Sequence, residues 1–500
     1  AMAADLFRAR QSFFLVNGST AGVLAMVIST CGPGETLLMP RQDHAAGSRI
    51  RLHLPGHGGG PGLPPELQKL CPEYARMDLT ELPGLDDLHS PAGPIREAEA
   101  MAADLFRARQ SFFLVNGSTA GVLAMVISTC GPGETLLMPR QAHVSAYHAL
   151  ILSGAWPSFL PVATDGKGFP LNVTAAAVEQ AFSRHPAAKA LLVTSPSYFG
   201  VCADLASIAD ITRRHGALFL LDEAHGAHLD FHPDRAAVGR SADLRVQSWH
   251  KTLGALTPGA LLHRHGDTVD PARLRATLRW VQTSSPSYPV LLSLDAVRKR
   301  MALTGHQVMA ELYQKAAFLR EKLRQSLPLL ESDALGQHGF GLDILRITVF
   351  CGQAAVDGLQ AARLLARQGI NVELSDKGHL LLVVGPGFSS QEAVTVADAF
   401  DRLPQEQVGA VGLPHPLPEP QVAVLPREAA FASAESVPLA QAEGRIAAAL
   451  VDIFPPGIPV LAPGEKVTQQ VLDCLAAAQE AGMVLRGLEL QGNLRVVCGR

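Results

Sequence analysis

Two short stretches of the chain bring together acid, histidine and lysine side chains that suit amine chemistry. Residues 222–228 read Asp-Glu-Ala-His-Gly-Ala-His and follow a very apolar run, and Lys251 lies in a Ser-Trp-His-Lys-Thr sequence that begins at Ser248. A lysine that has lost its proton forms a Schiff base with an aldehyde, and a carboxylate such as Asp222 stabilises a protonated ring nitrogen. A single lysine is far more often a solvated surface residue, so the prediction rests on the whole group.

Three further stretches offer polar groups to a ligand. Residues 116–121 read Asn-Gly-Ser-Thr-Ala-Gly and stand between a strand-like run and a helical pattern. Amides at a helix N-terminus attract a phosphate there, and an ordinary helix cap is the alternative. The imidazole of His143 could stack on an aromatic ring, although a structural or capping histidine is the commoner case. The hydroxyl-rich turn 283–288, which contains Ser285, fits either a phosphate contact or a helix cap.

The elements that must position these residues follow from the alternation of apolar runs and helical patterns over 94–265. Near-continuous apolar strands separated by helices predict an α/β fold with a mostly parallel sheet covered on both faces. Because such sheets bind ligands beyond the carboxyl ends of their strands, the polar residues are expected to meet there. We expect strands at Ser111–Val115, Thr135–Pro139, Ser158–Val162, Ala190–Thr194, Ala217–Asp222, Arg245–Ser248 and Pro258–His263, and helices at Ser118–Cys130, His143–Ser153, Thr174–His185 and Leu205–His215.

Composition and pattern divide the rest of the chain into units. An N-terminal arm over 46–93 precedes a large domain over 94–330, and a smaller α/β unit over 331–403 follows. Residues 404–437 are rich in Pro, Glu and Ala, which indicates a linker before a terminal segment over 438–500. Within the smaller unit we expect strands at Leu342–Phe350, Ile370–Glu373 and His379–Val384, and helices at Ala354–Arg367 and Gln391–Arg402.

An unbroken repeat occupies the N-terminus, because residues 1–42 are identical to residues 100–141. Structural repeats drift in sequence and usually number three or more. Identity over this length therefore indicates a recent duplication or an artefact of gene assembly, and we favour the artefact. One sheet has one place for this strand, so residues 1–45 are expected to pack poorly or to occupy a non-native position. Their removal should leave ligand binding intact.

Composition argues against several classes of protein. The chain has 42 Lys and Arg against 46 Asp and Glu, and no basic excess favours a nucleic-acid partner. No apolar run reaches membrane-spanning length, and no signal peptide is expected. Seven scattered cysteines without a CxxC pair are typical of reduced thiols in a cytoplasmic protein. The Asp-Glu-Ala-His run also occurs in helicases, but the phosphate-binding pattern GxxxxGK[ST] is missing from the sequence.

In their order along the chain, these residues resemble fold-type I pyridoxal-phosphate (PLP) enzymes, and among them the ornithine/lysine/arginine decarboxylase family. The resemblance covers most of residues 50–490 and is closest to short members that lack an N-terminal receiver-like domain. It implies an aspartate aminotransferase-like large domain with a mostly parallel seven-stranded sheet, together with small α/β C-terminal domains. The runs that carry it are LHLPGHGGG, DLTELPGLDDLHSPAGPIREAE, LVNGSTAG, TSPSYFGVCADL, LDEAHGAH, SWHKTLGALTPGALLH, QTSSPSY and FPPGIPVLAPGE.

The resemblance implies a role for each candidate residue. Lys251 would carry PLP through a Schiff base, and Asp222 would face the pyridine nitrogen. His143 and Ala224 would lie against opposite faces of the ring. Ser285 would reach the phosphate in a neighbouring subunit, which makes a homodimer the smallest active unit. The other contacts to the cofactor, most of them to its phosphate, are expected from Ser118, Thr119, His225, Ser248 and His250.

Some positions depart from the family pattern or bear on the substrate. Larger members often have Lys-Ser after the stacking histidine, where this chain has Val144-Ser145, and a Trp where it has His225. The basic end of the substrate requires an acidic partner. Glu373 and Glu465 are candidates for that partner, and ordinary surface carboxylates are the alternative.

The implied reaction is decarboxylation of arginine, lysine or ornithine, which yields CO2 and a polyamine precursor. The catalytic residues would be His143, Asp222, His250 and Lys251, with Lys251 or His250 returning a proton to Cα. Two alternatives stay open. Another fold-type I PLP enzyme, such as an aminotransferase, would form a keto acid and not CO2. A non-catalytic relative that binds polyamines or partners would lack the absorbance of a bound cofactor.

Overall fold

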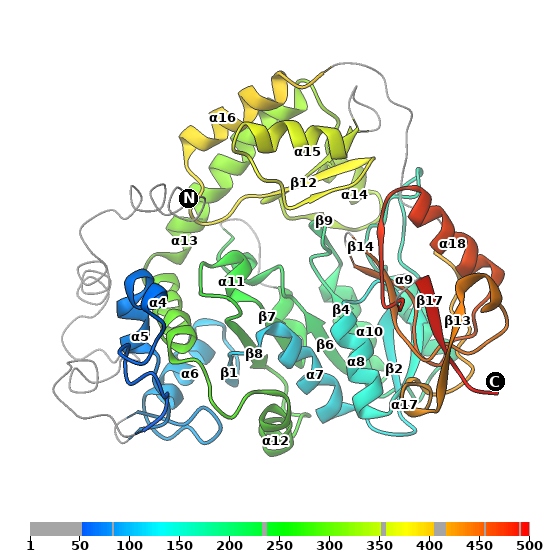
Figure 1. Cartoon of the computed structure of the whole chain (residues 1–500), viewed down its shortest axis with the longest axis horizontal. Helices are drawn as coiled ribbons and strands as arrows, with labels where there is room; N and C mark the ends of the chain where they lie inside the picture. Colours follow the sequence, from blue (N-terminus) through cyan, green and yellow to red (C-terminus); the bar gives the residue numbers. More distant parts are fainter. Residues whose placement is uncertain are drawn as a thin grey trace.

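Figure 1 shows the computed structural model of the chain, which describes residues 53–82, 85–232, 238–351, 357–404, 417–454, 457–489 and 492–499. The prediction for residues 1–45 concerns a segment outside these ranges. None of the helices in the described ranges is long and apolar enough to cross a membrane.

A seven-stranded sheet forms the centre of the large domain. Its strands are β1 (Gln110–Leu114), β2 (Thr135–Pro139), β3 (Trp156–Leu160), β4 (Ala190–Thr194), β6 (Leu218–Asp222), β7 (Leu244–Gln247) and β8 (Ala260–Arg264). They lie in the order β1-β8-β7-β6-β4-β2-β3. The neighbours from β7 to β3 are parallel, whereas β8 is antiparallel to both β1 and β7. The prediction of a mostly parallel seven-stranded sheet is therefore confirmed.

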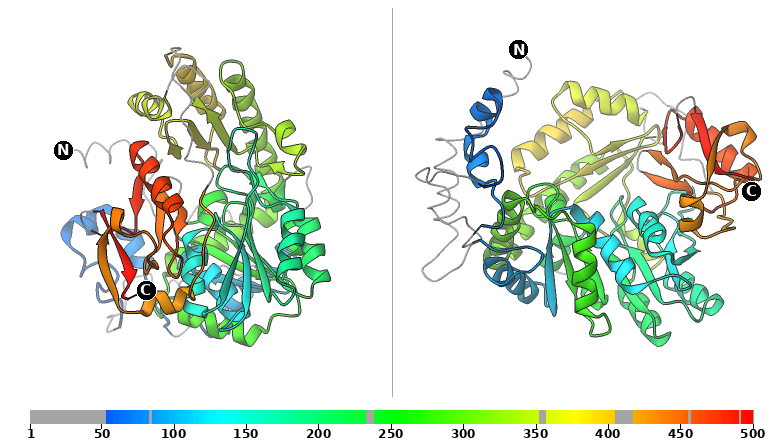
Figure 2. Two further views of the ribbon diagram at one scale, coloured as in Figure 1. Left: turned by 90° about the vertical axis from the view of Figure 1, so that its right-hand side faces the viewer. Right: turned by 60° about the horizontal axis from the view of Figure 1, so that its bottom comes forward.

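Alternate residues of the strands pack into two different cores, one on each face of the sheet. Leu220 of β6 lies in the core beneath α7 (Gly117–Thr129), α8 (Val144–Ser153) and α12 (Pro271–Val281). Its neighbour Leu221 lies in the core beneath α9 (Ala175–Arg184) and α10 (Leu205–Arg214). Successive side chains of a strand point to opposite faces, so a sheet covered on both sides requires continuously apolar strands. Figure 2 shows the helices on both sides of the sheet.

A long helix, α13 (Tyr288–Arg324), connects the large domain with a smaller α/β unit, which lies above it in Figure 1. The sheet of this unit is antiparallel and has the order β10 (Arg346–Phe350), β12 (His379–Val383), β11 (Leu374–Ser375). Helix α15 (Gly358–Arg367) packs on the sheet and α16 (Ser390–Asp401) on α13. A short antiparallel pair, β5 (Val201–Cys202) with β9 (Gly341–Leu342), joins the unit to the loop after β4.

The C-terminal segment builds two small sheets around α18 (Gln469–Glu480). One pairs β13 (Ala434–Pro438) with β17 (Asn493–Val497), and the other has β14 (Val451–Phe454) between β15 (Ile458–Leu461) and β16 (Val484–Arg486). Helix α17 (Pro426–Phe431) packs on α8 of the large domain. The remaining short helices are α4 (Pro65–Leu70), α5 (Pro72–Met77), α6 (Pro94–Leu105), η1 (Ala227–Phe231), η2 (Val238–Ser241), α11 (Trp249–Thr252), α14 (Ser332–Gly336) and η4 (Leu439–Gln441).

Three predicted elements differ from the structure. The interval 404–437, predicted as a linker, contains α17 and most of β13. Pro426 fits the first turn of a helix, and β13 gains its hydrogen bonds from β17, a partner that the local composition does not show. The predicted strand at Ile370–Glu373 is also wrong, because β11 begins at Leu374, directly after the predicted range ends. Strand β3 begins at Trp156, two residues before the predicted Ser158, because Trp156 pairs with the first residue of β2.

Candidate active site

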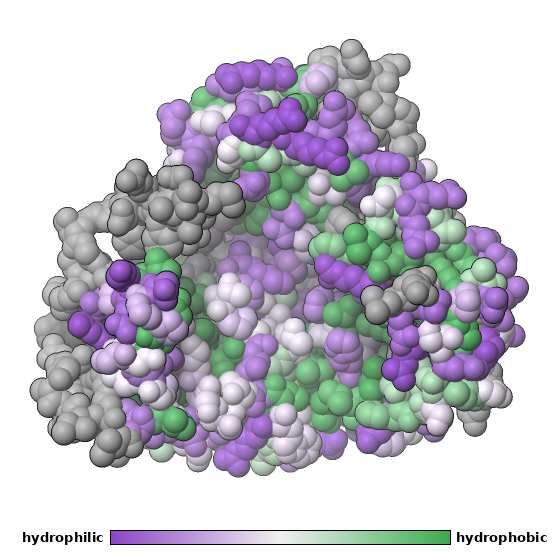
Figure 3. All heavy atoms as spheres, viewed as in Figure 1, coloured by the Kyte–Doolittle hydropathy of each residue, from purple (hydrophilic) through white to green (hydrophobic). Residues whose placement is uncertain are grey.

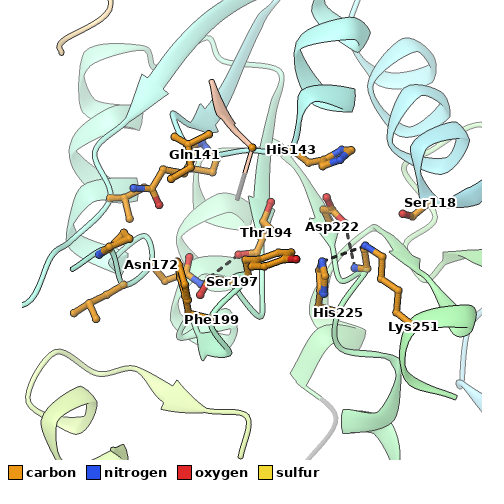
Figure 4. Close-up of a pocket in the computed structure, with 18 residues that line it drawn as sticks. Ser118, Gln141, His143, Asn172, Thr194, Ser197, Phe199, Asp222, His225 and Lys251 are labelled. Atoms are coloured by element: carbon orange, nitrogen blue, oxygen red, sulfur yellow. Dashed lines mark hydrogen bonds between the residues drawn. The ribbon is translucent and has the colours of Figure 1, made fainter. Parts of the chain in front are cut away.

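A pocket of about 890 Å³, partly open to solvent, lies at the carboxyl ends of β2, β4 and β6 (Figure 4). On the face shown in Figure 3, the surface is hollowed between the large domain and the smaller unit. The predicted residues that line the pocket are Ser118, His143, Asp222, Ala224, His225 and Lys251. They come from separate turns after β1, β2, β6 and β7, and the shared direction of the parallel strands brings most of them together.

Lys251 points toward the imidazole of His225. Its Nζ lies 3.1 Å from Nε2 of that ring, and Nδ1 of the ring is hydrogen-bonded to Arg346 of β10. Loss of hydration lowers the pKa of Lys251, whereas the nearby Asp222 carboxylate raises it and Arg346 lowers it further. The amine is therefore closer to its free-base form than an ordinary lysine, which suits a nucleophile.

Asp222 is the last residue of β6 and is almost completely buried. Burial raises the pKa of Asp222, while His143 and Lys251 oppose that shift through their charges. Its Oδ1 accepts a hydrogen bond from the backbone N–H of Ala224 at 3.1 Å. A buried carboxylate of this kind is stabilised by a cationic ligand group such as a protonated ring nitrogen.

His143 caps the N-terminus of α8 with its own ring. Its Nδ1 accepts a hydrogen bond from the backbone N–H of Ser145 at 3.2 Å, so a neutral ring carries its proton on Nε2. Burial lowers the pKa of His143, which favours that neutral ring. An uncharged imidazole that lines the pocket is suited to stacking on an aromatic ligand.

Ser118 lines the pocket, and its hydroxyl contacts the hydroxyl of Ser248, which is buried next to it outside the lining. Ser248, which follows β7, donates its hydroxyl to Ser118 Oγ over 2.8 Å, and Ser118 lies in the first turn of α7. The N-terminus of α7 adds free backbone N–H groups and the positive end of the helix dipole. This combination suits a phosphate.

The remaining predicted residues lie outside the lining of the pocket. Thr119 is exposed on α7, and Ser248 is buried behind Ser118. His250 directs its Nδ1 at the carbonyl oxygen of Gly259, 3.0 Å away, and burial lowers its pKa. Ser285 is exposed and does not line this pocket. Its proposed role in a neighbouring subunit stays a prediction.

The two acidic candidates for the substrate have different surroundings. Glu465 is buried and paired with Arg140, with 2.8 Å between Oε2 and Nη2, so the suggestion that it binds substrate is wrong. This ion pair fastens the C-terminal segment to the end of β2. Glu373 is exposed and accepts a hydrogen bond from the hydroxyl of Tyr198 at 2.6 Å, and Tyr198 lines the pocket.

Several pocket residues escaped the sequence prediction. Thr194 ends β4, and its buried hydroxyl oxygen has no hydrogen-bond partner in the structure. Gly457 and Ile458 reach the pocket from the C-terminal segment. Tyr198 and Gly457 both lie within runs that carry the family resemblance, so position within these runs was the available signal. No comparable signal marked Arg346.

Comparison with known proteins gives matches along nearly the whole chain. Residues 42–337 match the family described as "Orn/Lys/Arg decarboxylase, major domain", and residues 393–494 match its C-terminal domain. An arginine decarboxylase of Bacillus subtilis is 35% identical over 462 residues, which is 90% of this chain and 94% of that protein. The lysine decarboxylase LdcA of Pseudomonas aeruginosa is 27% identical over a match that covers 87% of this chain and 75% of that protein.

Solved structures show the same fold at lower identity. The lysine decarboxylase LdcF of Francisella novicida superposes with a TM-score of 0.77 at 19% identity, covering 91% of this chain and 79% of that one. The Pseudomonas aeruginosa enzyme gives the same TM-score at 22% identity, covering 92% and 80%. Because the matched family domains span most of the sequence in the expected order, the chain belongs to the Orn/Lys/Arg decarboxylase family.

Proposed function

We propose that this chain removes the α-carboxylate of arginine in a PLP-dependent reaction, which gives CO2 and agmatine. The family makes it an amino-acid decarboxylase that acts on a basic amino acid with PLP as cofactor. Arginine is favoured among the three substrates because relatives named arginine decarboxylase are 33–35% identical over 84–90% of the chain. The relatives named lysine decarboxylase are 27% identical or less.

The observation that carries the proposal is the meeting of Lys251 and Asp222 in one pocket. The lysine has a lowered pKa and can attach an aldehyde. The carboxylate of Asp222 is buried in the same pocket and has no hydrogen bond to a charged side chain among those that the structure describes. Bound PLP supplies an electron sink for the bond between Cα and the carboxylate.

The pocket residues also fit the other parts of PLP. Ser118, Ser248 and the N-terminus of α7 would hold the phosphate. Asp222 would keep the ring nitrogen protonated, and neutral His143 would lie against the ring with Ala224 on its other side. The unpartnered hydroxyl of Thr194 indicates that a polar ligand group belongs beside β4.

Within this arrangement, we assign binding and proton transfer to three side chains. Glu373 would bind the guanidinium of the substrate, and the hydroxyl of Tyr198 holds its carboxylate in place. Lys251 would return a proton to Cα, because its amine borders the pocket and Asp222 supports its charged form. His250 is the weaker candidate, since its ring is bonded to the Gly259 carbonyl and lies outside the lining.

The proposed assembly is a homodimer in which Ser285 of one copy reaches the phosphate bound by the other. The exposure of Ser285 away from the pocket of its own subunit is compatible with this role. Cytoplasmic location and the absence of nucleic-acid and membrane partners belong to the same proposal.

The direct test is an assay of amine products from arginine, lysine and ornithine, with the full chain and PLP. We expect CO2 and agmatine in equal amounts, and turnover of arginine at least tenfold above that of the other two. A keto acid without CO2 would identify an aminotransferase and contradict the proposal. Absence of both products together with absence of a visible absorbance band would favour a non-catalytic protein.

A further inference from the structure

The imidazole of His225 has a hydrogen-bond partner on each ring nitrogen. Nδ1 is bonded to Nη2 of Arg346, and Nε2 lies 3.1 Å from Nζ of Lys251, a contact that Figure 4 marks with a dashed line. Arg346 is 3% exposed and stands at the start of β10, so it reaches the pocket wall from the smaller unit. Its Nη1 donates a second hydrogen bond to the carbonyl oxygen of Tyr198 at 3.0 Å.

The chemistry of the two outer groups determines where the proton of His225 lies. A guanidinium has N–H donors and no acceptor, so Nδ1 must accept the hydrogen bond from Arg346. A neutral imidazole carries a single ring proton, which is then on Nε2 and points at Lys251. The lysine nitrogen can accept that hydrogen bond only as an uncharged amine, because an ammonium group has no lone pair.

The other tautomer of His225 would have the opposite effect. With the proton on Nδ1, the free lone pair of Nε2 would accept a hydrogen bond from a lysine ammonium and stabilise it. Arg346 cannot form a hydrogen bond with a protonated Nδ1, because both groups would then be donors. The choice between the two tautomers therefore depends on Arg346.

We propose that Arg346 is a positioning residue that holds the proton of His225 on Nε2 and thereby keeps Lys251 as a free amine. The inference rests on the proposed attachment of PLP to Lys251. In that step the amine forms a bond to the aldehyde carbon and gives up two protons to the oxygen, which leaves as one water molecule. The free amine is the nucleophile, so its share of the lysine population sets the rate of attachment.

Charged and titratable groups face Lys251 from several elements. Two carboxylates favour its ammonium form, and they oppose the effect of the guanidinium. His250 adjoins it on α11, and the neutral rings of His143 and His225 border the same space. The groups outside α11 are Asp222 of β6, Glu373 before β11, Arg346 of β10, His143 and His225. Burial lowers the pKa of Lys251, the two carboxylates raise it, and Arg346 lowers it, so the proposed tautomer of His225 acts in the same direction as burial.

The test measures the rate at which full-length protein freed of cofactor captures added PLP, followed by the visible absorbance band, from pH 6 to pH 10. We expect Arg346→Met and Arg346→Gln to shift the rate profile by about one pH unit toward alkaline pH, which is roughly tenfold slower capture below neutrality. Arg346→Lys, which offers only donors, should restore the wild-type profile. PLP titrates identically in every sample, so differences between profiles belong to the protein.

A double-mutant cycle separates the tautomer from the charge of the guanidinium. If Arg346 acts through His225, Arg346→Met should cause little further shift in a His225→Leu background. An equal shift in both backgrounds would mean that the charge acts directly and would overturn the proposal, as would an unshifted profile in folded Arg346→Met and Arg346→Gln. Circular dichroism identifies a variant that has failed to fold, and the glutamine variant retains a polar group for Tyr198. Wild-type protein that captures PLP and releases CO2 leaves the proposed function intact in either case.

Discussion

The hydroxyl oxygens of Ser118 and Ser248 are 2.8 Å apart, although the two residues are separated by 130 positions in the sequence. Ser118 lies in the first turn of α7 and Ser248 directly follows β7, so segments after two strands of the sheet contribute to one polar site. The N-terminal amides of α7 lie beside them. We interpret this pair as the phosphate end of the cofactor site.

Ser248→Ala should weaken the binding of PLP by about tenfold to a hundredfold, since a hydrogen bond to a charged group contributes about 1.5–3 kcal/mol. The binding of pyridoxal, which lacks the phosphate, should change much less. Titration of cofactor-free protein with each compound, followed by absorbance, measures the two affinities. An equal loss for both compounds would show that Ser248 does not contact the phosphate.

Lys251→Ala should abolish both the visible absorbance of bound cofactor and the release of CO2, because no other amine would attach the aldehyde. Lys322→Ala, an exposed lysine on α13, is the matched control and should behave as wild type. Reduction with borohydride followed by mass spectrometry identifies the modified lysine. Modification of a different lysine in the wild-type protein would remove Lys251 from its proposed role.

Glu373→Gln should raise the KM for arginine by about tenfold or more, because a charge-assisted hydrogen bond to the guanidinium is replaced by a neutral one. The absorbance of bound PLP should remain, since the hydrogen bond of Glu373 is to Tyr198 and it acts on Lys251 only through its charge. Glu480→Gln at the exposed end of α18 is the control. Unchanged KM in Glu373→Gln would require another acceptor for the substrate side chain.

Arg140→Met should destabilise the protein by about 3–5 kcal/mol, because it leaves the buried carboxylate of Glu465 without its partner. Activity should fall as well, since the C-terminal segment held by this pair supplies Gly457 and Ile458 to the pocket. Urea unfolding gives the stability. The exposed pair of Arg324 and Glu321 provides the control, and Arg324→Met should cost about 0.5 kcal/mol or less. Equal stabilities of the two variants would contradict the anchoring role.

The stability of the folded chain should fall as the pH rises toward 7, in part because of Glu99. Burial raises the pKa of Glu99 from 4.5 to about 7, although its carboxylate accepts a hydrogen bond from the backbone of Phe113. Because the pKa of Glu99 is higher in the folded state, its protonated carboxyl contributes fully to the stability of the fold below about pH 4.5. This contribution is lost as the pH rises through 7. The loss is about 3 kcal/mol.

Glu99→Gln should therefore flatten the decline in stability between pH 5 and pH 8. Urea unfolding of wild type and variant at both pH values measures the difference. Glu223, whose pKa burial also raises to about 7, should leave a residual decline in the variant. A decline of the same size in both proteins would mean that Glu99 titrates normally.

The local pattern was sufficient for the large domain and for the centre of the site. Continuous apolar runs such as β4 and β6, alternating with helical patterns, identified the strands of a sheet buried on both faces. Parallel strands present their carboxyl ends at one edge, so Asp222, His143 and Lys251 could be expected to meet. The structure brings these three side chains into one pocket.

The pairing of distant segments could not be obtained in this way. The residue type of Glu465 suits a substrate ligand, whereas its burial against Arg140 excludes that role, and the composition around β13 indicates a linker because its partner β17 is far along the chain. Arg346 bears on the chemistry only because the smaller unit folds back over the loop after β4 and places it against His225. Amino-acid type and local periodicity report on contacts between neighbours in sequence, whereas burial, ion pairing and the tautomer of a histidine depend on groups that only folding brings together.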